Sequence, residues 1–232
     1  MRKYNFIKAI LGWVFRIIFR IKYVNREKQP PKGTPYIVCS NHSHFFDVVP
    51  IGLALDPQIH FMAKKEVFKT PFLRGVAKIM GAFPVNRGGG DIGAIKKTID
   101  LLKKGECVGI FPQGTRCSYI DPSLTEPKEG IGVIASRAGV GILPVCVRTK
   151  RNKMGVFRKT EIVIGDYIPP EALEFSELNG MEKHKAITNL AFSQVCKMNN
   201  EIERKPLSAE KTAEILEKIG RKMNKHNDKS SK

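Results

Sequence analysis

Short apolar runs that alternate with helical patterns constrain the fold of this chain more than any other feature. The runs cover residues 36–39, 59–63, 82–85, 107–111, 142–147 and 161–165. We expect each run to form a strand. Because strands that alternate with helices indicate an α/β fold, we predict a three-layer αβα sandwich around a mixed, largely parallel sheet.

Two helical patterns between these runs have clear ends. In residues 91–104, Asp91 is placed to cap the amino terminus and Gly105 follows the last turn. A second helix is expected near residues 129–138, ahead of Gly139. Both helices would connect predicted strands, as the connections of a parallel sheet do.

The length of 232 residues suits one domain with appendages, or at most two small domains. We expect a core domain over residues 24–170, preceded by a helix over 1–23. A helical extension over 171–223 and a disordered tail over 224–232 would follow it. The expected helices of the extension are 171–178, 181–204 and 208–223, and they would either cover the sheet or reach a membrane.

Residues 1–23 carry an amphipathic helical pattern. Arg16 and Arg20 lie along one stripe, whereas Trp13 and Ile17 line the other side. A charge at the bilayer centre costs about 2.5–3.5 kcal/mol, so these arginines disfavour a membrane span. Trp with interleaved Arg is typical of a helix that lies in the membrane interface, which is our interpretation. The alternatives are an ordinary helix that packs on the core and, less favoured, a membrane span.

The composition narrows the classes of partner. The formal net charge is +18, which suits an anionic membrane, a phosphorylated substrate or nucleic acid. Nucleic acid is disfavoured, because no zinc-finger spacing, aromatic RNP strand or helix-turn-helix pattern is found. The 5 cysteines are scattered, which indicates buried thiols in a reducing compartment and neither disulfides nor a metal site.

The most informative local pattern is His42 followed five residues later by Asp47, just after the run 36–39. Five residues correspond to about 140° around a helix, so the two side chains would not share a helical face. They can meet if His42 lies in the turn after the strand and Asp47 in the turn beyond it. The carboxylate would then fix the imidazole tautomer and leave the second ring nitrogen free to accept a proton. The alternative is a histidine that only stabilises its own turn.

Three further blocks follow His42 and Asp47 in the chain. They are Phe83-Pro84-Val85-Asn86-Arg87, then Phe111-Pro112-Gln113-Gly114-Thr115-Arg116, and then Leu143-Pro144-Val145. With N-H-x4-D from Asn41 to Asp47, these blocks resemble, in order, those of the glycerolipid acyltransferase family. The resemblance covers roughly residues 30–170. The departure is Gln113, where the family usually has Glu, so that the hydrogen-bonding capacity is retained but the charge is not.

The resemblance implies an acyltransferase core over residues 24–170, with lysophosphatidic acid as the acyl acceptor. The donor would be acyl-CoA or acyl-carrier protein, and neither a cofactor nor a metal would be needed. His42 would be the general base and Asp47 its orienting partner. Direct attack on the thioester is expected, so we disfavour Cys39 or Cys117 as a nucleophile.

We expect the acceptor phosphate to bind arginine, whose planar fork matches phosphate oxygens. Arg87 and Arg116 each follow a predicted strand, which would bring them to the sheet edge that carries His42. Further candidates are Gly114 and Thr115, whose backbone N–H groups could approach the substrate, and Asn41, Gln113 and Lys64. His44 is not among these candidates, since a polar loop residue explains it better than a catalytic role does.

Two alternatives remain at this stage. The acceptor could be glycerol-3-phosphate or another lysophospholipid, or the chain could be a basic membrane-binding module without catalysis. The pair His42 and Asp47 argues against the second alternative. In either acyltransferase reading, we expect a peripheral or monotopic protein on the cytoplasmic face of the cell membrane.

Overall fold

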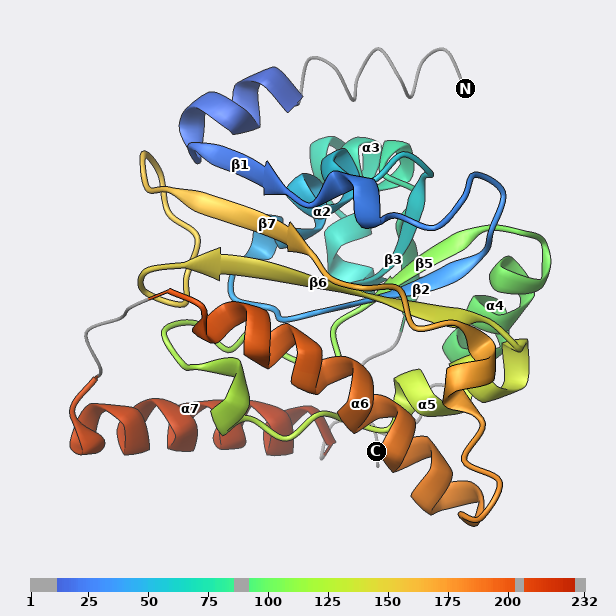
Figure 1. Ribbon diagram of the computed structural model, residues 1–232. Helices are drawn as coiled ribbons and strands as arrows, with labels where there is room; N and C mark the ends of the chain where they lie inside the picture. Colours follow the sequence, from blue (N-terminus) through green and yellow to red (C-terminus); the bar gives the residue numbers. More distant parts are fainter. Residues whose placement is uncertain (1–11, 86–91, 203–206, 228–232) are drawn as a thin grey trace.

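A seven-stranded sheet forms the centre of the computed structural model, which describes residues 12–85, 92–202 and 207–227 (Figure 1). The strands are β1 (Ile21–Val24), β2 (Tyr36–Ser40), β3 (Ile59–Lys64), β4 (Phe83–Val85), β5 (Cys107–Ile110), β6 (Gly141–Thr149) and β7 (Thr160–Ile164). Their order in the sheet is β1-β7-β6-β2-β5-β3-β4. Each predicted strand is present within about two residues of its expected ends, and β1 is an addition.

The sheet is mixed and largely parallel, as the sequence predicts. β2 pairs in parallel with both β5 and β6, and β3 pairs in parallel with β4 and β5. Among the strands that the structure describes, β6 and β7 form the antiparallel pair, and β1 then lies parallel to β7. A short connection joins β6 to β7, which an antiparallel pair permits, whereas parallel neighbours require longer crossovers.

Helices cover both faces of the sheet and complete the three layers. The helices after β2 are α2 (Val48–Ala54), α3 (Pro71–Ile79), α4 (Ile92–Lys103), α5 (Gly130–Ala138), α6 (Gly180–Asn200) and α7 (Ala209–Asn227). Of these, α7 packs on Cys117 and Ile120 of the segment after β5 and does not cover the sheet. Alternate residues of β2 point to opposite faces, so that Ile37 and Cys39 pack in one cluster while Tyr36 and Val38 pack in the other. The predicted sandwich is therefore confirmed.

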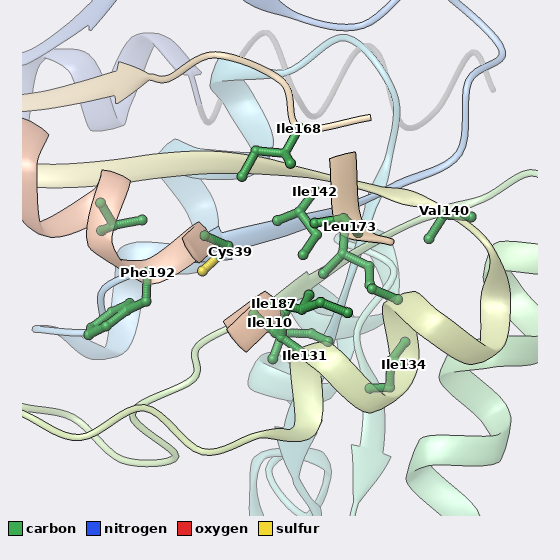
Figure 2. Packing of buried hydrophobic residues seen from close by; sticks show 14 of the residues in the cluster. Cys39, Ile110, Ile131, Ile134, Val140, Ile142, Ile168, Leu173, Ile187 and Phe192 are labelled. Carbon is green, nitrogen blue, oxygen red and sulfur yellow. The ribbon is translucent and has the colours of Figure 1, made fainter. Parts of the chain in front are cut away.

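The larger cluster lies between the sheet and helices α4, α5 and α6. Ile131 of α5 and Ile187 of α6 are fully buried there against Ile142 of β6 (Figure 2). The two helices approach closely at Gly132, where an added Cβ would lie 2.0 Å from the carbonyl oxygen of His184. Helix α6 therefore covers the sheet, which decides the question that the sequence left open.

The amino-terminal prediction needs a correction. Residues 12–18 are helical, but the chain then turns at Phe19 and Arg20 and enters β1, so the helix does not reach residue 23. The β1 residues pair with the exposed edge of β7, from Ile21 opposite Thr160 to Val24 opposite Val163. The β1 segment contains β-branched and aromatic residues, which favour a strand over a helix when the edge of another strand is available for pairing. Residues 1–11 lie outside the described residues.

Two carboxy-terminal predictions also change. The helix expected over 171–178 is replaced by a single 3₁₀ turn, Pro170–Leu173, because two prolines at its start and a short length favour a turn. The tail expected from residue 224 is still helical, since α7 continues to Asn227. Glu214 and Lys218 form an i,i+4 pair on that helix, which supports its extension. Residues 228–232 and the interhelical residues 203–206 lie outside the described residues.

Candidate functional site

The candidate site is assembled where parallel strands end at one edge of the sheet. His42 follows β2 by two residues, and Arg116 follows β5 by six. Because β2 and β5 are parallel neighbours, the segments that follow them meet, and the Cys117 backbone N–H donates to the His42 carbonyl oxygen at 2.7 Å. The predicted shared edge is therefore confirmed for these two segments. Arg87 lies outside the described residues, two positions beyond the end of β4.

His42 and Asp47 form a buried pair, as their spacing predicts. The distance from His42 Nδ1 to Asp47 Oδ2 is 3.0 Å. The His42 side chain is 8% exposed and that of Asp47 is 0% exposed. A carboxylate is an acceptor only, so Nδ1–H is the donor in this hydrogen bond, and in the neutral imidazole Nε2 then keeps its lone pair.

The turn between the two residues explains how Asp47 is held. It contains the 3₁₀ turn Phe45–Asp47, and α2 begins at the next residue. Asp47 Oδ2 also accepts hydrogen bonds from the backbone N–H groups of Ser43, at 2.6 Å, and His44, at 2.7 Å. These donors satisfy a carboxylate that is fully buried, and they aim it at the His42 ring.

Two side chains from the segment after β5 support His42. The Phe111 ring stacks on the imidazole with ring centroids 4.1 Å apart and an interplanar angle of 14°. The His42 backbone N–H donates to Gln113 Oε1 at 2.7 Å, and Gln113 Nε2 donates to Thr125 Oγ1 at 2.9 Å. Gln113 is 2% exposed, so its amide links the turn between His42 and Asp47 to the following loop through neutral hydrogen bonds.

Asn41 and Gly114 have structural roles in this arrangement. Asn41 forms hydrogen bonds with the backbone N–H and carbonyl of Val147, at 2.8 and 3.0 Å, and thereby extends the pairing of β2 with β6. Gly114 adopts φ +67°, and its N–H donates to the Phe111 carbonyl at 3.0 Å. The Gly114 N–H is therefore committed to a turn, which weakens its candidacy for substrate phosphate.

The remaining predicted residues lie nearer the surface. Arg116 is exposed, and it forms no ion pair with a carboxylate among the described residues. Thr115 is half-buried beside it. Lys64 pairs with Glu66 at 3.3 Å, which neutralises the cation that we considered for phosphate. Arg116 is thus the predicted phosphate ligand that the structure leaves available.

Sequence reasoning missed the contacts of Phe111, Ser43 and Ser118. In the sequence Phe111 is the first residue of a block, and an aromatic residue at the end of the strand beside β2 is a signal for the observed stack on His42. The Ser118 hydroxyl donates to the Ser43 carbonyl oxygen at 2.6 Å, which connects the loop after β5 to the turn between His42 and Asp47. No local sequence pattern predicts this contact, because the two residues are far apart in the chain.

The environment of the titratable groups favours histidine over cysteine chemistry. Burial raises the pKa of the Cys39 thiol well above its ordinary value, and burial raises the pKa of Cys117 to about 11. Neither thiol would be a thiolate near neutral pH. Burial also lowers the pKa of His44, with Asp47 opposing that shift and Lys153 and Arg116 adding to it. In the described part of the chain, no group of three or more His, Cys, Asp or Glu side chains is placed to bind a metal ion.

Comparison with known proteins assigns the class. A sequence profile of the family described as Acyltransferase matches residues 20–148. The 1-acyl-sn-glycerol-3-phosphate acyltransferase of Bacillus subtilis (strain 168) is 31% identical over 204 residues, which cover 87% of this chain and 99% of that protein. The protein of the same name from Streptococcus pneumoniae R6 is 29% identical over 180 residues, which cover 75% of this chain and 66% of that protein.

A solved structure has the same fold. The crystal structure of the 1-acyl-sn-glycerophosphate (LPA) acyltransferase PlsC from Thermotoga maritima superposes with a TM-score of 0.62. It is 23% identical in sequence, and the match covers 86% of this chain and 79% of that one. With a family profile over more than half of its length, this chain belongs to the acyltransferase family and is an acyl-transferring enzyme.

Membrane association is consistent with the class, but the described residues contain no spanning segment. None of their helices is both long enough and apolar enough to cross a bilayer.

Proposed function

We propose that this enzyme transfers a fatty acyl group from an acyl thioester to the free hydroxyl of 1-acylglycerol-3-phosphate, giving phosphatidic acid. The observation that carries the proposal is the buried His42–Asp47 pair at the edge where the strands end. The names of the B. subtilis and S. pneumoniae relatives support the choice of acceptor.

In this mechanism His42 is the general base. Asp47 holds Nδ1–H, so Nε2 accepts the proton of the acceptor hydroxyl as its oxygen attacks the thioester carbonyl. The new C–O bond forms, the C–S bond breaks, and the thiolate of the donor leaves and takes up the proton. Asp47 also stabilises the imidazolium that forms during the transfer. The stack on Phe111 keeps the ring in one orientation.

Arg116 is the proposed ligand of the acceptor phosphate. It is exposed, it follows β5 on the same segment as Phe111 and Gln113, and it has no carboxylate partner among the described residues. A guanidinium can bind two phosphate oxygens at once, which orients the lipid as well as attracting it. Arg87 is proposed for the same phosphate from the sequence pattern alone. The donor is acyl-CoA or acyl-carrier protein, and no cofactor takes part.

We also propose that the enzyme sits on the cytoplasmic face of the membrane without spanning it. Trp13 is 70% exposed and Ile17 is 50% exposed on helix 12–18, whereas Phe19 at its end is buried. Phe157 of the β6–β7 connection is 69% exposed, and its N–H donates to the Ile18 carbonyl oxygen at 2.6 Å. Exposed apolar residues on adjoining segments, in a chain of net charge +18, fit an anionic lipid surface.

The alternatives predict different assays. An enzyme for glycerol-3-phosphate or another lysophospholipid would prefer that acceptor when purified protein is offered a panel of acceptors with acyl-CoA and acyl-carrier protein donors. A module without catalysis would show no turnover with any of them. We expect the highest kcat/KM with 1-acylglycerol-3-phosphate, and a clear preference for another acceptor would contradict the proposal.

The catalytic role is tested with His42→Ala and the matched control His44→Ala in the same turn. A positioned base is worth about 10²- to 10⁴-fold, so His42→Ala should lose at least that lower factor in kcat with unchanged thermal stability. Asp47→Asn should also lose most activity, because the amide can no longer accept from His42, Ser43 and His44 as the carboxylate does. His44→Ala should keep kcat within a few fold. A His42→Ala enzyme with more than about a tenth of wild-type kcat would exclude the base role.

A further inference from the structure

Lys153 lies in the connection between β6 and β7, which none of the sequence blocks includes, yet its ammonium is held in one place. Its Nζ is 3.1 Å from the Tyr119 hydroxyl oxygen. The same Nζ lies over the Tyr119 ring, 4.6 Å from its centroid. The hydrogen bond and the cation–π contact from one ring together restrict a lysine side chain that is otherwise flexible. Among the described residues, Lys153 forms no ion pair with a carboxylate.

The backbone around this contact is strained. Tyr119 has φ +69° and Asn152 has φ +48°, both in the left-handed region. Asn tolerates this region, but for Tyr it is unusual. The two residues are joined by a hydrogen bond from the Tyr119 N–H to the Asn152 carbonyl oxygen, at 2.9 Å. Backbone strain of this kind persists where the surrounding structure fixes the conformation, and it is found more often at ligand-binding sites.

A short chain of contacts connects Lys153 to the catalytic turn. Ser118, next to Tyr119, donates its hydroxyl hydrogen bond to the Ser43 carbonyl oxygen. Arg116 lies three residues before Tyr119 on the same segment. Lys153 and Arg116 each add to the lowering of the His44 pKa, so both cations are in the neighbourhood of this residue.

We propose that Lys153, oriented by Tyr119, is a second cation for the phosphate of the acyl acceptor and acts together with Arg116. This inference rests on the function proposed above, since it assigns a further residue to the phosphate subsite of that reaction. Two cations near one turn repel each other, and a phosphate with about −1.5 to −2 charge between them would relieve that repulsion. Lys supplies a point charge where Arg supplies the directional fork. Tyr119 is a positioning residue.

The test compares Lys153→Ala with Lys150→Ala, which removes the same charge from an exposed residue of the same connection. Both are assayed in mixed detergent micelles, so that attraction to a bilayer does not contribute. A charge-assisted hydrogen bond corresponds to about 10- to 100-fold in affinity. Lys153→Ala should therefore raise the KM for 1-acylglycerol-3-phosphate by about that factor, with kcat and the donor KM nearly unchanged. Lys150→Ala should leave all three constants unchanged.

A second arm separates phosphate binding from a general effect on the site. Monoacylglycerol has the acceptor hydroxyl but no phosphate, so its slow wild-type turnover should be the same in Lys153→Ala. Tyr119→Phe keeps the ring but removes the hydrogen bond to Nζ, so the acceptor KM should rise by only about 2- to 10-fold. Arg116→Ala and Lys153→Ala should combine non-additively if they bind one phosphate.

The outcomes distinguish the two proposals. If wild-type enzyme acylates 1-acylglycerol-3-phosphate but Lys153→Ala keeps the wild-type KM, the inference about Lys153 fails and the proposed function stands. Equal losses with monoacylglycerol, or equal effects of Lys150→Ala, would also overturn it. A lipid-surface role would instead appear as weaker sedimentation of Lys153→Ala with phosphatidylglycerol vesicles and an unchanged KM in micelles. If wild-type enzyme does not use the phosphorylated acceptor at all, the proposed function itself is wrong.

Discussion

At the scale of single residues, His42 is defined by the groups that surround it. Asp47 fixes its tautomer at a distance of 3.0 Å, Phe111 covers one face of its ring, and Gln113 holds its backbone. These contacts explain why Gln can stand at position 113, where the family usually has Glu. What the position must supply is an acceptor for the His42 N–H and a donor for Thr125, and a neutral amide supplies both.

This explanation predicts the behaviour of two substitutions. Gln113→Ala leaves the buried His42 N–H without its acceptor, so we expect a loss of about 1–3 kcal/mol in the free energy of unfolding and a lower kcat. Gln113→Glu retains the acceptor and should keep more activity than Gln113→Ala, although Thr125 loses its donor. Denaturant unfolding and initial-rate kinetics measure both effects. A Gln113→Ala enzyme as stable and active as wild type would show that the hydrogen bond does not position the turn.

At the scale of elements, the segment from helix 12–18 to β1 combines two roles. β1 belongs to the sheet through its pairing with β7, and buried Phe19 joins the core cluster on the same side. The helix before it packs through Phe15 and Ile18 but leaves Trp13 and Ile17 exposed. The packed side agrees with an ordinary helix on the core, and the exposed side is the one on which the proposed membrane contact depends. Truncation to residue 23 would remove part of the sheet, so point substitutions are the sharper experiment.

The exposed side is tested with the double variant Trp13→Ala and Ile17→Ser. Because both side chains are exposed, the substitutions should leave thermal stability almost unchanged, yet they should weaken sedimentation with phosphatidylglycerol vesicles and lower activity on bilayer substrate. Activity in detergent micelles should be retained. The matched control is Ile92→Ser, since Ile92 is 80% exposed at the start of α4. Vesicle binding equal to that of wild type would exclude the helix as a membrane contact.

At the scale of the whole molecule, burial of cysteine thiols contributes to the way the stability of the protein responds to alkaline pH. Burial raises the pKa of Cys107 and Cys117 to about 11, and that of Cys196 to about 12, from an ordinary value of 9.0. At a pH between 9 and about 11, the thiols of the unfolded chain have lost protons that the thiols of the folded protein still hold. The stabilisation by neutral, buried thiols is therefore complete below pH 9 and is lost as the pH rises toward 11.

We accordingly expect the free energy of unfolding to fall as the pH rises from 9 to 11. Denaturant unfolding at several pH values measures the fall, and Cys107→Ala with Cys117→Ala should make it less steep. Below pH 8, thiol reagents should modify these cysteines slowly in the folded enzyme and rapidly after denaturation. Rapid modification of Cys117 with loss of activity at neutral pH would contradict its burial and would revive a thiolate mechanism.

Local patterns determined much of this protein. The strands β2 to β7, the helices α4 and α5, and the His42–Asp47 pair follow from apolar runs, end signals and a five-residue spacing, because the interactions concerned lie within one segment. The meeting of the segments after β2 and β5 could also be predicted, since parallel strands place their carboxyl ends at one edge.

Only the tertiary structure decided the rest. The pairing of β1 with β7, the place of α6 over the sheet, the stack of Phe111 on His42 and the Tyr119–Lys153 contact each join residues that are distant in the chain. A local pattern does not specify such partners, because a free strand edge or an apolar face can be covered by any segment that the topology brings near it. The physical reason is that the free energy of apolar burial and of strand pairing depends on contact in space and not on separation along the sequence.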